Sequence, residues 1–307
     1  MAEWLYEAGI GEARAALVED GAILEARIEL DGLRAGTVAE GRLRAGKRVE
    51  LAEGEVLLDH VPRGATEGAR LTVEIVREAI PEATRTKLPK AVATDKPVAP
   101  GPDLLARITA TGIPVRHCQA HEPDRLEAAG WSEVLEEAIT GEIGFPGGAL
   151  LMSVTPAMTL FDVDGGGSAE ALALAAAPAA AAAILRHGIG GSIGIDFPTL
   201  ANKAARGAVA EAIDAALPQP FERTAVNGFG FLQLVRRRTR ASLPELLRAD
   251  PVGAEARATL RRIERLLPPL PASHIVPPRV LRLLDAQPGW TGELARRMGG
   301  PQLFKES

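Results

Sequence analysis

The stretch Thr159-Leu160-Phe161-Asp162-Val163-Asp164-Gly165 is a short apolar run that ends on acids, and Ile193-Gly194-Ile195-Asp196-Phe197-Pro198 repeats this pattern. Runs of this length, rich in β-branched and aromatic residues, are typical of buried strands. An Asp that meets Gly or Pro then lies at the solvent-facing end of its strand. One helix-sized, alanine-rich stretch at residues 169–185 separates the two runs. We therefore expect both carboxylates at one edge of a sheet.

Two carboxylates held this close repel each other unless a cation lies between them. Oxygen ligands suit a hard divalent ion, and Mg²⁺ is the usual choice. Asp162 and Asp196 are therefore candidate Mg²⁺ ligands. Either Asp taken alone is more typical of a turn or a helix cap, so the prediction depends on the pair.

The composition limits what the chain can be. Its 307 residues suffice for about two domains, and 46% of them are hydrophobic, which is enough for a core. A formal charge of −5 restricts any nucleic-acid surface to a local patch. The single cysteine, Cys118, excludes an intrachain disulfide framework and fits a reducing cytoplasm. We expect no signal peptide, and we expect a soluble helix rather than a membrane span at residues 169–185.

Changes in pattern along the chain predict separate units. The first third alternates short β-type runs with glycine turns, which indicates a small barrel or meander. Residues 81–102 contain five prolines and little apolar periodicity, so we expect a linker there. From residue 103 onward the pattern is αβ. The helix expected at residues 255–267 carries on its polar side Arg257, Arg261, Arg262 and Arg265.

Four motifs follow one another along the second half of the chain. They are Glu142-Ile143-Gly144-Phe145-Pro146-Gly147-Gly148-Ala149-Leu150, Leu160-Phe161-Asp162-Val163-Asp164, His187-Gly188-Ile189-Gly190-Gly191-Ser192-Ile193-Gly194-Ile195-Asp196-Phe197 and Asn227-Gly228-Phe229-Gly230-Phe231-Leu232-Gln233-Leu234-Val235-Arg236-Arg237-Arg238. Together they resemble the catalytic half of the ribonuclease E/G family. Residues 73–78 are similar to the end of that family's S1-type barrel, and residues 257–300 are weakly similar to its small terminal domain.

The resemblance implies an α/β (α+β) fold with several parts. These are an RNase H-like subdomain at residues 1–30 and 103–145, a reduced S1-like β region at 31–80, a linker at 81–102, a DNase I-like catalytic subdomain at 146–245 and a small C-terminal α/β domain at 250–307.

The resemblance also implies roles for individual residues. In the family, the two Asp positions hold the Mg²⁺ that activates water for attack on RNA, so Asp162 and Asp196 are the implied metal ligands. Asp164 falls where many members carry Asn, and we expect an auxiliary ligand or a water-orienting group. Arg236 and Arg238 match a basic motif beside the active site and would share a strand face from which to bind RNA phosphates. Lys203 is a further candidate for phosphate binding. A solvated surface is the alternative for these basic residues.

Some features depart from the family pattern. Residues 34–77 contain no Phe, Tyr or Trp, so the usual aromatic platform for single-stranded RNA is missing from this region. With one cysteine the chain cannot form the family's CPxC zinc link, which leaves open a homodimer without it. Phe229 and Phe231 alternate with glycines, and we expect them to pack in the core rather than stack on bases.

Taken together, the sequence predicts a cytoplasmic, Mg²⁺-dependent endoribonuclease that hydrolyses phosphodiester bonds of single-stranded RNA, without a membrane partner. Two alternatives stay open. One is a catalytically weak or inactive RNA-binding member of the same family. The other is an interaction or scaffold protein, which the acidic charge and the apolar alanine helix would fit.

Overall fold

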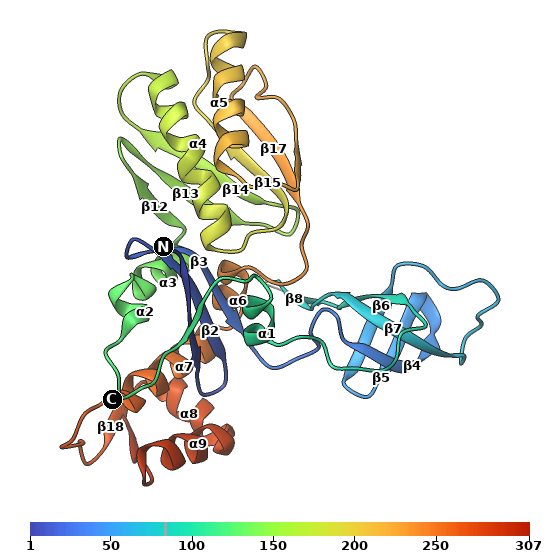
Figure 1. The fold of residues 1–307 in the computed structure, drawn as a ribbon, viewed down its shortest axis with the longest axis vertical. Helices are drawn as coiled ribbons and strands as arrows, with labels where there is room; N and C mark the ends of the chain where they lie inside the picture. Colours follow the sequence, from blue (N-terminus) through green and yellow to red (C-terminus); the bar gives the residue numbers. More distant parts are fainter. Residues whose placement is uncertain (83–84) are drawn as a thin grey trace.

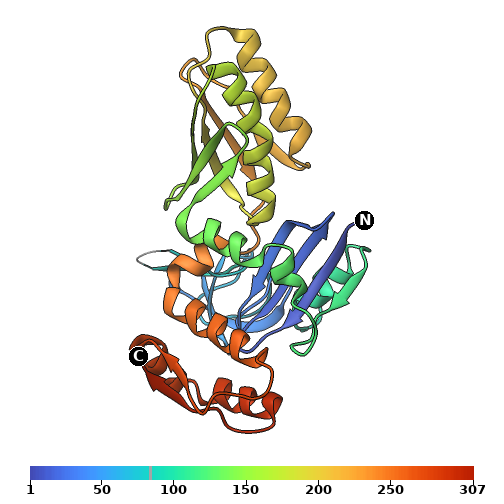
Figure 2. The ribbon, with the colours of Figure 1, turned by 90° about the vertical axis from the view of Figure 1, so that its left-hand side faces the viewer.

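The computed structural model describes residues 1–82 and 85–307 and has a mixed α/β fold (Figure 1). Its strands form a four-stranded sheet, a closed five-stranded barrel, a six-stranded sheet and two short two-stranded pairs. Figures 1 and 2 show the six-stranded sheet at one end of the molecule and the four-stranded sheet at its centre. In Figure 1 the barrel projects from the centre to one side.

The central sheet joins segments that are far apart in the sequence. Its order is β11-β1-β2-β3, and β1 pairs with β11 in parallel, so residues from 1–30 and 103–145 share one sheet. The strands are β1 (Glu3–Ala8), β2 (Ala13–Glu19), β3 (Ala22–Glu29) and β11 (Val115–His117). The helices that follow are α1 (Leu104–Thr109), α2 (Arg125–Ala128) and α3 (Trp131–Thr140). Leu126 and Trp131 pack with Leu5 of β1 in one core.

The barrel is complete rather than an open meander, and part of the expected linker closes it. Its order is β10-β6-β5-β4-β7. The strands are β4 (Val38–Arg44), β5 (Arg48–Leu51), β6 (Gly54–Leu58), β7 (Arg70–Arg77) and β10 (Lys90–Ala93). β10 lies within residues 81–102 and pairs with both β6 and β7. The short strands β8 (Ile80–Pro81) and β9 (Thr86–Lys87) also pair in that segment. A four-residue strand with one fully buried side chain, Ala91, leaves too little periodicity to be recognised in a sequence.

The six-stranded sheet contains the strands that carry the two aspartates; the first continues past Asp162 to Gly165, whereas the second ends at Asp196. Its order is β12-β13-β14-β15-β17-β16. The strands are β12 (Glu142–Phe145), β13 (Gly148–Val154), β14 (Thr159–Gly165), β15 (Gly191–Asp196), β16 (Phe221–Arg223) and β17 (Phe231–Arg236). The helices α4 (Ala169–Arg186) and α5 (Lys203–Ala216) pack with the apolar side of this sheet in one core. The sheet begins at Glu142, a few residues before the expected boundary at residue 146.

The expected alanine helix is α4, and small side chains let it lie close to the sheet. Ala173, Ala176 and Ala180 are fully buried in the core that it shares with β14 and β15. Within the described ranges, α4 is the one helix that has the length and apolar composition of a membrane span. Its packing on the sheet accounts for that composition.

The C-terminal part continues from the central sheet. It contains α6 (Leu243–Ala249), α7 (Pro251–Glu264), β18 (His274–Val276), α8 (Pro278–Ala286), α9 (Pro288–Met298) and β19 (Phe304–Glu306). Leu243 and Leu247 of α6 pack in the same core as Leu5, so α6 belongs with the central sheet rather than with the six-stranded one. Ile10, just after β1, packs with α7, α8 and α9.

Ion pairs fix α7 against the central sheet, and three of the four arginines expected on its polar side take part in them. Arg257, which is 5% exposed, donates to Glu12 over 2.9 Å. Arg261 donates to Glu7 over 2.8 Å and to Asp124 over 2.7 Å. Burial by itself would raise the pKa of Asp124, but the hydrogen bond from Arg261 lowers the pKa below its ordinary value. These acidic partners lie in β1, in the β1–β2 turn and at the start of α2. Periodicity in the sequence does not indicate that these segments meet α7.

Replacing Glu7 tests how far the fold depends on these ion pairs. Glu7 is 7% exposed and accepts hydrogen bonds from Arg14, Arg261 and Arg265. Glu7→Gln removes the negative charge and leaves the buried guanidinium groups only partly compensated, by Glu12 and Asp124, so we expect a loss of about 3 kcal/mol in the free energy of unfolding. Urea unfolding followed by tryptophan fluorescence measures this loss, because Trp4 and Trp131 are buried in the same unit.

Glu50→Gln is the matched control, since Glu50 pairs with Arg44 on the exposed barrel surface. We expect it to change the same free energy by less than about 1 kcal/mol. Equal effects of the two substitutions would contradict a special role for the buried ion pairs.

Candidate metal and nucleic-acid site

The two aspartates predicted from the sequence lie side by side. β14 and β15 are parallel, and their register places Asp162 opposite Asp196. Phe161 and Ile195, the residues before them, are fully buried in the core with α4 and α5. Because successive side chains of a strand point to opposite faces, both Asp side chains lie on the face away from the helices. Adjacent strands are about 4.8 Å apart, so the carboxylates are neighbours.

Both carboxylates are exposed and have no protein partner. Within residues 1–82 and 85–307, neither Asp162 nor Asp196 accepts a side-chain hydrogen bond or forms an ion pair, whereas most buried acids of the protein do. Their neighbouring charges are therefore not neutralised by the chain. The pair has the arrangement that the sequence predicted for cation ligands.

Asp164 adds a third carboxylate near the pair. It is exposed and lies two residues after Asp162 on the same face, about 7 Å further along the strand. In the described parts of the chain, no three His, Cys, Asp or Glu side chains are gathered closely enough to form a metal site from protein ligands alone. The donor set fits Mg²⁺, which commonly takes one or two carboxylates and keeps several water ligands.

Two helices begin at this same edge of the sheet. Ser168 caps α4 and accepts from the backbone N–H of Ala171 over 3.2 Å, and Asn202 caps α5 and accepts from Ala205 over 2.9 Å. Lys203 is the exposed first residue of α5. Helix N-termini favour negative charge, and Lys203 adds a cation. The edge therefore combines acidic ligands with groups that attract an anion.

Arg236 and Arg238 do not lie beside the Asp pair. Asp196 is opposite Phe231, whereas Arg236 is opposite Gly191, five positions or about 17 Å away along the strand. Arg236 is an even number of residues from the buried Leu232 and Leu234, so its side chain points to the same, helix-covered face of the sheet. It donates to the carbonyl of Ile189 over 3.4 Å.

Arg238 lies beyond the end of β17 and forms an ion pair with Glu245 of α6. The two arginines therefore do not extend from one strand face as expected. Their predicted contact with phosphate stays a prediction, and this structure gives them other partners.

These arginines belong to a basic junction between the units, which we define as Arg77, Arg236, Arg238 and Arg240. Burial, together with Arg27 and Arg107, lowers the pKa of Arg240 to about 10, so it stays charged at neutral pH. Burial and Arg238 also lower the pKa of Arg77. The backbone N–H of Glu78 donates to the carbonyl of Thr239 over 2.8 Å. Sequence reasoning missed this junction because the residues meet only in the tertiary fold.

The two phenylalanines of the last motif differ in environment. Phe231 is half-buried, and its ring lies against Gly194, where a Cβ would clash with it. Phe229 is 84% exposed, so the expectation that it packs in the core was wrong. It lies in the turn before β17, where the chain leaves the sheet at the edge that carries Asp196.

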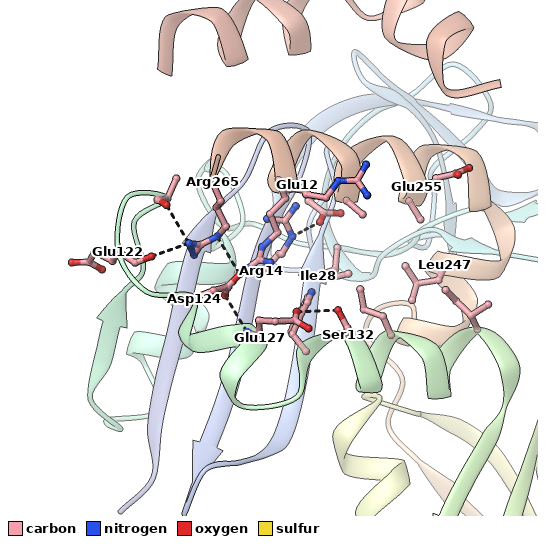
Figure 3. A pocket seen from close by; sticks show the side chains of 18 of the residues that line it. Glu12, Arg14, Ile28, Glu122, Asp124, Glu127, Ser132, Leu247, Glu255 and Arg265 are labelled. Carbon is pink, nitrogen blue, oxygen red and sulfur yellow. Dashed lines mark hydrogen bonds and ion pairs between the residues drawn. The ribbon is translucent and has the colours of Figure 1, made fainter. Parts of the chain in front are cut away.

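A large cavity lies elsewhere, over the central sheet (Figure 3). It has a volume of about 1130 Å³ and lies between α3 and α7. Figure 3 shows Asp124 and Arg265 paired at one side of it, with Ile28 and Leu247 among the apolar lining residues. None of the three aspartates of the candidate site lines this cavity. Its charged side chains largely neutralise one another, so the cavity offers apolar surface rather than free carboxylates for a cation.

Two free carboxylates side by side on adjacent parallel strands are a donor set that suits a divalent cation. A model of the Ribonuclease E/G family matches residues 103–239, which include both Asp strands and β17. This agrees with the resemblance of the four motifs, and residues 103–239 are similar to the ribonuclease E/G family. No curated protein matches the chain.

Cation binding provides a direct test of the carboxylate pair. We expect the purified protein to bind Mn²⁺, a spectroscopic substitute for Mg²⁺, and Asp196→Asn to weaken this binding at least about 10-fold by removing a charged ligand. Electron paramagnetic resonance of free Mn²⁺ measures the affinity. Asp285→Asn, at an exposed position of α8, is the control and should bind as the wild type does. Equal Mn²⁺ affinity in all three proteins would contradict this site.

Proposed function

We propose that the protein is a Mg²⁺-dependent endoribonuclease that cleaves single-stranded RNA at the edge formed by β14 and β15. The family match indicates ribonuclease activity in general. The observation that carries the finer proposal is the register that sets Asp162 beside Asp196 with no cationic side chain to neutralise them. We also propose that the six-stranded unit is the DNase I-like catalytic subdomain and that the central sheet is the RNase H-like one.

Each residue of this edge has a chemical task in the proposal. Asp162 and Asp196 would hold the metal ion through carboxylate oxygens. Bound Mg²⁺ would supply an acidified water and neutralise charge that develops on the phosphodiester. Asp164 would accept a hydrogen bond from the attacking water and orient it. Lys203 would donate from Nζ to a phosphate oxygen and place the scissile bond near the carboxylates.

The exposure of the site supports an extended, single-stranded substrate. The three aspartates and Lys203 are all exposed rather than enclosed in a pocket. Figure 1 shows α4 and α5 beginning at the end of the six-stranded unit that is remote from the central sheet, so the carboxyl ends of β14 and β15 are there too. A chain of nucleotides can reach this edge without opening the fold. We place the activity in the cytoplasm, with RNA as the partner and no membrane.

Substitution of Asp196 tests catalysis separately from binding. We expect Asp196→Asn to reduce Mg²⁺-dependent internal cleavage of a 5′-labelled single-stranded RNA by at least about 10³-fold, because a metal ligand is lost. Its affinity for the same RNA in EDTA should be equal or higher, since one repulsive charge is removed. Gel analysis of products and fluorescence anisotropy measure the two quantities.

Asp285→Asn is the matched control and should cleave at the wild-type rate. Wild-type protein that binds RNA but gives no Mg²⁺-dependent products would contradict the proposal and favour the inactive RNA-binding alternative. Protein that neither binds nor cleaves RNA would favour the scaffold alternative.

Lys203 is expected to contribute one phosphate contact. Lys203→Gln should weaken binding of RNA of any sequence and reduce the slope of log affinity against log salt by about 0.7. Arg282→Gln, on the exposed side of α8, is the control and should leave the slope unchanged. Titrations at several salt concentrations in EDTA measure the slope, and an unchanged slope in Lys203→Gln would remove this residue from the RNA-binding edge.

A further inference from the structure

Phe229 is an exposed aromatic side chain beside the candidate catalytic edge. It is 84% exposed, whereas the other phenylalanines, the three tryptophans and the tyrosine are all buried or half-buried. An exposed Phe gains nothing from burial within its own chain, while a buried one gains about 1.5–3 kcal/mol. Its position therefore needs an explanation other than packing of the core.

The turn that presents Phe229 is fixed by backbone hydrogen bonds. The side-chain oxygen of Asn227 accepts from the N–H of Phe229 over 2.9 Å and from that of Phe231 over 3.1 Å. Gly230 has a φ of +97°, and a Cβ there would clash with the carbonyl of Phe197. This close approach is secured by the N–H of Phe197, which donates to the carbonyl of Gly230 over 3.2 Å. The exposed ring is thus carried on a defined turn and not on a loose loop.

The same contacts connect the turn to the carboxylate pair. Phe197 directly follows Asp196, and Asp196 is opposite Phe231 in the sheet. Since Phe229 is two residues from Phe231, its Cα lies within about 13 Å of the Cα of Asp196. Gly228 and Gly230 carry no side chains that would shield the ring. The exposed Phe229 is therefore near enough to Asp196 for one extended strand of nucleotides to reach both.

The barrel lacks groups for the same task. Residues 34–77 contain no Phe, Tyr or Trp, and neither does β10, which completes the barrel. Single-stranded nucleic acids gain most of their sequence-tolerant contacts from bases stacked on aromatic rings. Among the Phe, Tyr and Trp rings in the described parts of the chain, Phe229 is the one whose exposure allows such stacking.

We propose that Phe229 stacks on a nucleobase of single-stranded RNA that neighbours the phosphodiester at Asp162 and Asp196. The inference rests on the proposed function, because it requires RNA at this edge. Stacking on a ring that is already held in place costs little ordering, and it would align the RNA backbone with the carboxylates. The ring makes no hydrogen bond to base edges, so the subsite would accept any base.

The test measures RNA binding without cleavage. The full-length protein is titrated, in EDTA and at low salt, into a short fluorescein-labelled single-stranded RNA, and anisotropy gives the affinity. We expect Phe229→Ala to bind about 10-fold more weakly, and Phe229→Trp to bind within about 2-fold of the wild type. Leu267→Ala, which truncates an exposed apolar side chain in the segment after α7, is the matched control and should bind as the wild type does.

A second set of RNAs identifies the stacked base. Each carries one abasic nucleotide at a different position. We expect one position at which the abasic RNA binds the wild type about 10-fold more weakly than intact RNA does. For Phe229→Ala, the same abasic RNA and intact RNA should bind equally well, because the ring and the base form one contact. In Phe229→Trp, indole fluorescence should be quenched by intact RNA.

Three results would overturn the inference. The first is equal RNA affinity of Phe229→Ala and the wild type. The second is a loss of affinity in Phe229→Ala, relative to the wild type, that is the same for intact RNA and for every abasic RNA. The third is Phe229-dependent self-association in sedimentation with RNA affinity unchanged, which would assign the ring to a protein contact. In all three cases RNA binding by the wild type, and cleavage that depends on Asp196, would leave the proposed function intact. Wild-type protein that does not bind RNA would overturn both.

Discussion

The parallel pairing of β14 with β15 is the constraint on which the candidate site depends. A slip of one residue would turn one Asp toward the helix-covered face and separate the two carboxylates. Burial of Phe161 and Ile195 opposes such a slip, since each contributes about 1.5–3 kcal/mol. Repulsion between two exposed carboxylates about 5 Å apart in water is about 1 kcal/mol. The hydrophobic core therefore outweighs the repulsion and holds two like charges together, which leaves the pair ready to bind a cation.

The remote position of this site gives the other units a supporting role. The central sheet is held to α7 by the ion pairs of Glu7 and Glu12, and the basic junction of Arg77, Arg236, Arg238 and Arg240 lies where the six-stranded unit meets the rest. The charges around Glu7 and Glu12 are buried and paired with one another, and in the junction Arg238 pairs with Glu245. They fix how the units are joined, while the free charges remain at the outer edge, where α4 and α5 begin.

The sequence was informative where a pattern is local. The apolar runs correctly indicated the strands that carry Asp162 and Asp196, although the first of them continues to Gly165, and the alanine-rich stretch indicated α4. The phenylalanine of the last turn was interpreted wrongly, and the buried ion pairs of the α7 arginines were not foreseen. An arginine on a polar helix side looks the same in a sequence whether it faces water or a buried Glu7. A phenylalanine between glycines looks the same whether its turn folds inward or, like Phe229, outward.

The sequence by itself determined the strand–helix–strand unit, the presence of an Asp on each of its strands and the family resemblance, because these follow from neighbouring residues and short-range periodicity. Only the tertiary structure decided that Asp162 is opposite Asp196, that β10 closes the barrel and that Arg236 lies at the far end of its strand from the acids. It also decided that Phe229 is exposed beside Asp196. The physical reason is that register, strand order and side-chain exposure arise from contacts between segments distant in sequence, whose energies no local pattern records.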